Sequence, residues 1–261
     1  MMRPDSPADV FSAYARVMLT IVLPALALTA AVAAQPATPP APQTRPTPTL
    51  APPPPPPALP VPSKPDAPDS PDTRPYVALT TDLGTITVRL EDKRAPVTAK
   101  NFLRYVDAKR MDGFQFYRST RSWGPANMLI QAGNRGDPRL NFPPIAHEPT
   151  NVTGLTNCKG ALSMARLAPG DATSDFFLLL SEIKGFDADP KLGGDNAGFA
   201  VFGEIVAGGE VAEKIYAAPV SETLGEGVMK GQMLAPMVTI KTARRVPAPA
   251  GAPTGCIVKA P

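Results

Sequence analysis

The chain carries four short apolar segments in a fixed order: Phe-Gln-Phe-Tyr-Arg at 114–118, Leu-Ile-Gln-Ala-Gly at 129–133, Gly-Ala-Leu-Ser-Met-Ala at 160–165 and Ser-Asp-Phe-Phe-Leu at 174–178. Each segment has the composition of a buried strand and includes one or two polar side chains. Among these, Arg118 and Gln131 are expected to lie beside Phe177. A guanidinium and an amide next to an aromatic surface suit a peptide bond that adjoins a proline ring.

Strand and helix signals continue on both sides of these segments. Apolar and polar residues alternate over 76–82 and 85–90, as in the two arms of a hairpin. Pro96 suits the first turn of a helix, where its missing N–H costs nothing, and an apolar stripe with helical spacing follows it. A second short helix is expected over 210–216 and a final strand over 237–245. The pattern predicts many short strands with two helices.

The four segments, with their order and their polar residues, resemble the cyclophilin family of peptidyl-prolyl cis-trans isomerases. The resemblance extends from about Tyr76 to about Val246. It implies a mainly β fold, a closed eight-stranded antiparallel barrel with two capping helices. The barrel of that family is filled with side chains, so the substrate is expected in a groove on its outside. The resemblance also implies catalysed rotation of Xaa-Pro peptide bonds with no cofactor and no metal.

The chemistry expected of Arg118 follows from the peptide bond. Rotation about C–N is opposed by ~18–20 kcal/mol because the nitrogen lone pair is shared with the carbonyl. In the twisted transition state the nitrogen becomes an acceptor, so a donor placed over it binds this state better than either planar state. Arg118 is the candidate donor, and one charge-assisted hydrogen bond contributes ~1.5–3 kcal/mol. Gln131 is expected to hold the carbonyl side.

By position, the resemblance assigns substrate contacts to residues on several segments. They are Phe114, Met128, Leu129, Ala165, Arg166, Asp175, Phe177, Phe186 and Phe199. Composition alone gives a different interpretation of the apolar members, which would then be ordinary core residues. Arg118 could likewise be a surface arginine paired with a carboxylate, and Gln131 could serve only to satisfy backbone groups.

Two of these positions depart from the pattern of the family. Arg166 stands where asparagine is usual, and Asp175 stands where glutamine is usual. The two changes favour an Arg–Asp ion pair in the wall of the substrate groove, in place of two neutral amides that contact the substrate backbone. We therefore expect Arg166 and Asp175 to alter efficiency or substrate preference.

The N-terminal part of the chain differs sharply from the rest. Residues 1–34 contain an apolar stretch that ends in small residues, as in an export signal that is cleaved or, alternatively, retained as a membrane anchor. Residues 35–75 hold 18 prolines in 41 positions and are expected to form a disordered, extended linker. The folded domain is expected over 76–246, followed by a disordered tail over 247–261.

Charge and side-chain chemistry argue against several classes of function. A net charge of +3 without a basic cluster disfavours a nucleic-acid partner. Two cysteines and one histidine argue against a zinc site. His147 has no nucleophile in a suitable motif nearby, which argues against a hydrolase. Cys158 and Cys256 either form a disulfide or, in the interpretation favoured by the sequence, remain unpaired thiols.

Two functions remain open at this point. The first is a monomeric exported isomerase, periplasmic or anchored in the inner membrane, that acts on proline-containing segments of unfolded or newly exported proteins. The second is a barrel of low activity that serves as a binding or chaperone module of the cell envelope. Retention of Arg118 favours the enzyme, whereas Arg166 and Asp175 favour the module. A membrane contact is expected only if residues 1–34 are retained.

Overall fold

The structure is a computed structural model that describes residues 72–121, 124–135, 137–192, 195–252 and 255–258. The chain divides into two units, Met1–Pro55 and Pro56–Pro261, and every described residue lies in the second. The expected signal segment and nearly all of the expected linker therefore lie outside the described residues. Within the described ranges, no helix is both long enough and apolar enough to cross a membrane.

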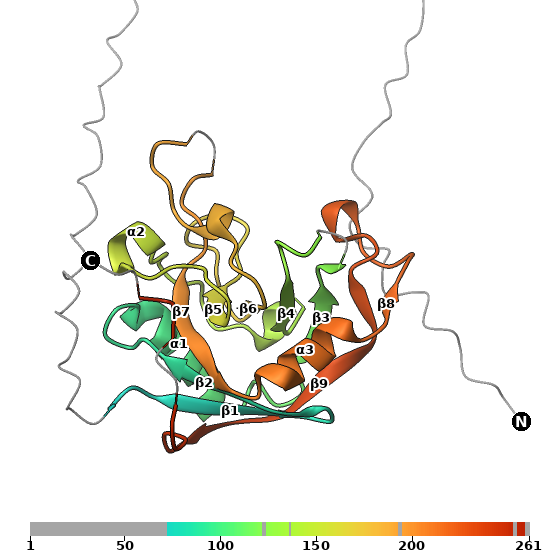
Figure 1. Cartoon of the computed structure of the whole chain (residues 1–261), viewed down its shortest axis with the longest axis horizontal. Coiled ribbons are helices and arrows are strands. Elements are labelled where there is room, and N and C mark those ends of the chain that lie inside the picture. Colours follow the sequence, from blue (N-terminus) through green and yellow to red (C-terminus); the bar gives the residue numbers. More distant parts are fainter. Residues whose placement is uncertain (1–71, 122–123, 136, 193–194, 253–254, 259–261) are drawn as a thin grey trace, which may run out of the picture. The chain divides into compact units, whose positions relative to one another are not determined.

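Strands are the predominant regular elements of the described residues, and long loops join them (Figure 1). In chain order the elements are β1 (Tyr76–Thr81), β2 (Gly84–Leu90), α1 (Pro96–Asp107), β3 (Gln115–Ser119), β4 (Leu129–Gly133), η2 (Pro138–Leu140), α2 (Thr150–Thr153), β5 (Ala161–Met164), β6 (Phe176–Leu179), η3 (Lys184–Phe186), β7 (Val201–Ala207), α3 (Gly209–Ala217), β8 (Val220–Ser221), η4 (Gly227–Met229) and β9 (Met233–Val246). The four apolar segments of the sequence form β3, β4, β5 and β6. The prediction of a mainly β fold with few helices is confirmed.

The described residues form one antiparallel sheet of nine strands in the order β1-β2-β7-β5-β6-β4-β3-β9-β8. β1 pairs with β2 on one side and with β9 on the other, where Tyr76 lies opposite Val246. Figure 1 shows β1 and β9 side by side along the lower edge of the view. The expected count of eight strands is wrong for this sheet, because the two-residue strand β8 pairs with β9.

Aromatic rings form the centre of the hydrophobic core. Phe116 on β3, Phe176 on β6 and Phe202 on β7 are fully buried. The ring of Phe102 on α1 lies 5.4 Å from that of Phe176 and 5.3 Å from that of Phe202. Successive side chains of a strand point to opposite faces, so the strands that bury these rings present their other residues on the opposite face.

The N-terminus of α1 is capped by a residue from a distant loop. The N-cap residue itself, Ala95, makes no side-chain hydrogen bond. Glu148 instead accepts hydrogen bonds from the backbone N–H groups of Val97 and Thr98, at 3.0 and 2.8 Å. The first turn of a helix leaves such N–H groups without intrahelical partners. The buried carboxylate of Glu148 therefore ties its loop to α1.

Residues 255–258 of the C-terminal tail pack onto the domain, contrary to the expectation of disorder in this stretch. Cys256 forms a disulfide with Cys158, and the side chain of Ile257 is buried. The interpretation of the two cysteines as unpaired thiols is wrong, because the chain folds back and brings the two sulfur atoms together. Arg74, at the end of the expected linker, is also tied to the domain by an ion pair with a buried glutamate.

Candidate active site

Three neighbouring strands align the central residues of the site. Arg118 on β3 lies directly opposite Gln131 on β4, and Gln131 in turn lies opposite Phe177 on β6. Residues that lie opposite each other on adjacent strands point to the same face of a sheet. The register therefore brings together the three side chains that the sequence indicated as the centre of the site.

Two glutamine side chains hold the guanidinium of Arg118. Its Nε donates to Oε1 of Gln232 at 2.9 Å, and its Nη1 donates to Oε1 of Gln131 at 3.0 Å. Arg118 is buried, and burial lowers the pKa of its guanidinium. The group still carries its charge at neutral pH, because an arginine ordinarily titrates above ~12. Arg118, Gln131 and Gln232 are named the arginine clamp below.

Sequence analysis did not identify Gln232, which lies 114 positions after Arg118 in the turn that precedes β9. The residue is fully enclosed, with 1% of its surface exposed. Its side-chain Nε2 donates to the backbone carbonyl of Val228 at 2.6 Å, and the backbone carbonyl of Gln232 accepts from the backbone N–H of Ser119 at 2.9 Å. These bonds fix the direction in which Oε1 points. No spacing or composition signal around Gln232 could have revealed this role.

Three phenylalanine rings, Phe177, Phe186 and Phe199, form an aromatic cluster next to the clamp. The ring centroid of Phe177 lies 5.3 Å from that of Phe199 and 5.8 Å from that of Phe186. The rings of Phe186 and Phe199 are 4.6 Å apart. Phe177 is buried, whereas Phe186 and Phe199 keep part of their surface open to solvent. The structure thus brings together three of the residues that the resemblance assigned as substrate contacts.

The other apolar candidates divide into two groups. Met128 is half-buried just before β4, and Ala165 retains 8% of its surface just after β5. Leu129 has no exposed surface, and the ring of Phe114 packs 6.1 Å from that of Tyr105 on α1. The side chains of Phe114 and Leu129 are enclosed by the domain as core residues are, and their contact with substrate stays a prediction.

Arg166 and Asp175 do not form the ion pair expected from the sequence. Nη1 and Nη2 of Arg166 lie 2.7 and 2.9 Å from the two carboxylate oxygens of Asp195. Its Nε also donates to the carbonyl of Gly198 at 2.9 Å. The hydrogen bonds from Arg166 lower the pKa of the Asp195 carboxyl. The expected pair is wrong because the loop before Gly198 supplies a carboxylate of its own.

Asp175 is held by donors from three neighbouring residues. The hydroxyl of Tyr117 donates to it at 2.7 Å, the hydroxyl of Ser174 at 3.1 Å and the backbone N–H of Asn134 at 3.2 Å. Burial raises the pKa of the Asp175 carboxyl and outweighs the hydrogen bonds, which lower it. The carboxylate packs on Gly133, where a Cβ atom would lie only 2.0 Å from an Asp175 oxygen.

The single histidine and the two cysteines are engaged in other contacts. Nε2 of the half-buried His147 lies 2.9 Å from the carbonyl oxygen of Ala197, and burial lowers the pKa of its imidazole. Ser163 donates to Asn157, and Cys158 is bonded to its disulfide partner. Over the described part of the chain, no three potential metal ligands lie close enough together to hold an ion.

Comparisons with known proteins agree on one family for this chain. Residues 76–244 match the family model described as "Cyclophilin type peptidyl-prolyl cis-trans isomerase/CLD". The chain is 38% identical over 146 residues to peptidyl-prolyl cis-trans isomerase A of Dickeya dadantii (strain 3937), a match that covers 55% of this chain and 72% of that protein. It is 34% identical over 146 residues to peptidyl-prolyl cis-trans isomerase B of Escherichia coli (strain K12), covering 53% and 82%.

A solved structure shows the same fold. The cyclophilin-type peptidyl-prolyl cis-trans isomerase of Cryptosporidium parvum superposes with a TM-score of 0.51 at 19% identity, over 67% of this chain and 99% of that one. The family match spans well over half of the 261 residues and contains every residue of the aromatic cluster and the arginine clamp. The chain therefore belongs to the family of cyclophilin-type peptidyl-prolyl cis-trans isomerases.

Proposed function

We propose that the domain accelerates rotation of Xaa-Pro peptide bonds in exported polypeptides and so assists their folding. The observation that carries this proposal is the arginine clamp, a buried charged guanidinium fixed by two neutral amide oxygens. The aromatic cluster beside it and membership of the family support the same function.

In this mechanism Arg118 donates to the nitrogen of the twisted prolyl bond. In the planar ground states this nitrogen is not a hydrogen-bond acceptor. The hydrogen bond from Arg118 therefore strengthens only as the transition state is approached. A hydrogen bond to a charged group contributes ~1.5–3 kcal/mol, which corresponds to roughly one to two decades of rate. The remaining acceleration must come from anchoring and desolvation of the substrate.

Gln131 and the aromatic cluster supply that anchoring. Oε1 of Gln131 accepts from Arg118, so its Nε2 is the atom that donates to the substrate carbonyl. The half-open rings of Phe186 and Phe199 cover the proline ring, and enclosing an apolar group of this size contributes ~1.5–3 kcal/mol. Exclusion of water by the rings also strengthens the hydrogen bond from Arg118.

The same domain is proposed to be a closed barrel that works as a monomer. Pairing of β1 with both β2 and β9 supports closure. The strands of the described residues all lie within 76–246, which supports the predicted domain limits, although the stretch around Ile257 adds to the core. A monomer suffices because one chain supplies the whole clamp.

An exported, periplasmic location is proposed on two grounds. Disulfides persist in oxidising compartments, and the Cys158–Cys256 bond supports such a location. The apolar stretch within residues 1–34 has the composition of an export signal or of an inner-membrane anchor. The expected substrates are proline-containing segments of unfolded or newly exported proteins.

An isomerisation assay on Xaa-Pro peptides tests the function. We expect turnover by the wild-type chain and at least a tenfold loss in Arg118→Ala, because the donor to the nitrogen is removed. Lys241→Ala serves as the control, since it removes an exposed cation whose ion-pair partner is Asp82, in the turn between β1 and β2, rather than a residue of the clamp. Wild-type turnover in Arg118→Ala would refute the mechanism, and an inactive wild-type chain that still binds peptides would favour the binding module.

A further inference from the structure

We propose that Asn157 is a positioning residue for the aromatic cluster, and that the C-terminal segment 255–258 keeps Asn157 in place through the Cys158–Cys256 disulfide. The inference deepens the proposed isomerase function and rests on it. The segment that the sequence presented as a loose tail thereby becomes part of the support of the substrate site.

Asn157 connects the backbone of the two half-open rings. Its Nδ2 donates to the carbonyl of Phe186 at 3.0 Å and to that of Phe199 at 3.4 Å. Its Nδ2 and backbone N–H also donate to Oδ1 of Asp187, at 2.9 and 2.8 Å. Its Oδ1 accepts from the hydroxyl of Ser163 at 2.7 Å, and Ser163 lies opposite Phe177 in the sheet. The buried amide of Asn157 therefore contacts the backbone of Phe186 and Phe199 and also Ser163, the cross-strand neighbour of Phe177.

These contacts matter because two of the rings lie outside the strands. Phe186 ends the short η3 turn, and Phe199 lies in the loop before β7. The direct backbone bond between them, from Phe199 N–H to the Phe186 carbonyl, measures 2.8 Å. Without Asn157 the Phe186 carbonyl keeps this backbone donor but loses its second one, and the Phe199 carbonyl loses the Asn157 amide, so the backbone of the two rings is held less firmly.

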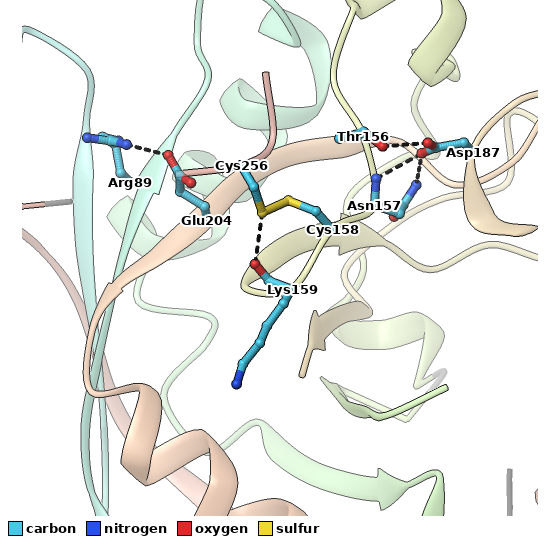
Figure 2. Close-up of a disulfide and its surroundings, with 8 residues drawn as sticks. All are labelled: Arg89, Thr156, Asn157, Cys158, Lys159, Asp187, Glu204 and Cys256. Atoms are coloured by element: carbon cyan, nitrogen blue, oxygen red, sulfur yellow. Dashed lines mark hydrogen bonds and ion pairs between the residues drawn. A yellow bond between two sulfur atoms is a disulfide. The ribbon is translucent and has the colours of Figure 1, made fainter. Parts of the chain in front are cut away.

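The tail holds the stretch that carries Asn157. The backbone N–H of Thr156 donates to the carbonyl of Ile257 at 2.8 Å, and Leu155 forms an antiparallel bridge with Val258. Figure 2 shows the disulfide at Cys158, the residue next to Asn157, while the side chains of Thr156 and Asn157 meet Asp187 on the other side. The stretch is thus fixed between the tail and the loop of the aromatic cluster.

The tail itself packs closely against a buried ion pair of the domain. A Cβ atom at Gly255 would lie 1.1 Å from Oε2 of Glu204. Glu204 cannot easily give way, because it is buried on β7 and forms an ion pair with the buried Arg89, as Figure 2 shows. Only glycine permits this close approach of the chain, so the position of Cys256 next to it is defined.

The test compares three variants with the wild-type chain. Asn157→Asp keeps the shape but removes the Nδ2 donor and faces Asp187 with a second carboxylate. The double variant Cys158→Ser with Cys256→Ser releases the tail, and Gly255→Ala displaces it with the disulfide intact. Asn151→Asp, the same change at an exposed position of α2, is the matched control. Each protein is assayed for kcat and KM on an Xaa-Pro peptide and for exchange of the Phe199 amide proton.

We expect at least a threefold rise in KM with kcat within twofold of wild type in all three variants, because the bonds of the arginine clamp join residues of β3, β4 and the turn before β9 and involve neither Asn157 nor the tail. Exchange of the Phe199 amide should accelerate at least tenfold, and the control should match wild type. An unchanged KM and unchanged exchange in folded Asn157→Asp would overturn the positioning role. The same result in both tail variants would overturn the role of the tail. An inactive wild-type chain would refute the proposed function alone, since amide exchange still decides the positioning of the cluster.

Discussion

Replacing Gln232 with alanine removes the acceptor for Nε of Arg118 and leaves the acceptor for Nη1, Gln131, in place. A hydrogen bond to a charged group contributes ~1.5–3 kcal/mol. If all of this free energy serves to orient the guanidinium in the transition state, loss of the hydrogen bond lowers the rate by roughly tenfold to a hundredfold. Because Gln131 still holds the group at 3.0 Å, we expect the lower limit, about a tenfold fall in kcat, with KM within twofold of wild type.

A double-mutant cycle separates orientation of Arg118 from any other effect of Gln232. In an Arg118→Ala background the change Gln232→Ala should have less than a twofold effect, because the group that it orients is absent. Gln115→Ala, on the same strand as Arg118 but half-exposed, is the matched control and should retain wild-type kcat. Equal effects of Gln232→Ala in both backgrounds, measured on folded protein, would contradict the clamp.

Three further predictions concern stability and specificity. Glu148→Ala should lower the free energy of unfolding by ~2 kcal/mol in a denaturant titration, because it uncaps α1; a change under ~0.5 kcal/mol would contradict this. Burial raises the pKa of Asp175, so its charged form lowers the free energy of unfolding once the pH exceeds the unfolded-state pKa of ~3.9. The free energy of unfolding of Asp175→Asn, relative to that of the wild type, should therefore increase between pH 3 and pH 7. A difference that does not depend on pH would count against this. Asp195→Ala frees the guanidinium of Arg166 and should raise the ratio of kcat/KM for acidic over basic peptides about twofold to fivefold, whereas an unchanged ratio would show that the pair does not face the substrate.

The sequence predicted the regular elements well because their signals are local. Alternation of apolar and polar residues located the first hairpin, and Pro96 is indeed the first residue of α1. The helix expected over 210–216 corresponds to α3, and the strand expected over 237–245 is the second part of β9. The neighbouring positions of Arg118, Gln131 and Phe177 were predicted from the order of the apolar segments.

Contacts between distant loops could not be predicted in this way. Gln232 meets Arg118 across 114 positions, and the disulfide joins cysteines separated by 98. The partner of Arg166 was misassigned for the same reason, because the sequence gives no measure of how a loop folds back over a strand end. Asp195 lies 29 positions from Arg166 in such a loop. Long-range pairs of this kind are decided by packing rather than by local pattern.

The unusual charges at Arg166 and Asp175 leave the chemistry of the clamp intact because each is satisfied locally. Arg166 is neutralised by Asp195, and Asp175 is held by hydroxyl and amide donors. The two clamp acceptors are neutral amides, so the clamp bonds orient the guanidinium of Arg118 without cancelling its positive charge. A carboxylate in either position would attract that charge and weaken the bond to the prolyl nitrogen. The substitutions are therefore expected to alter which peptides bind, while rotation of the prolyl bond continues to depend on the clamp.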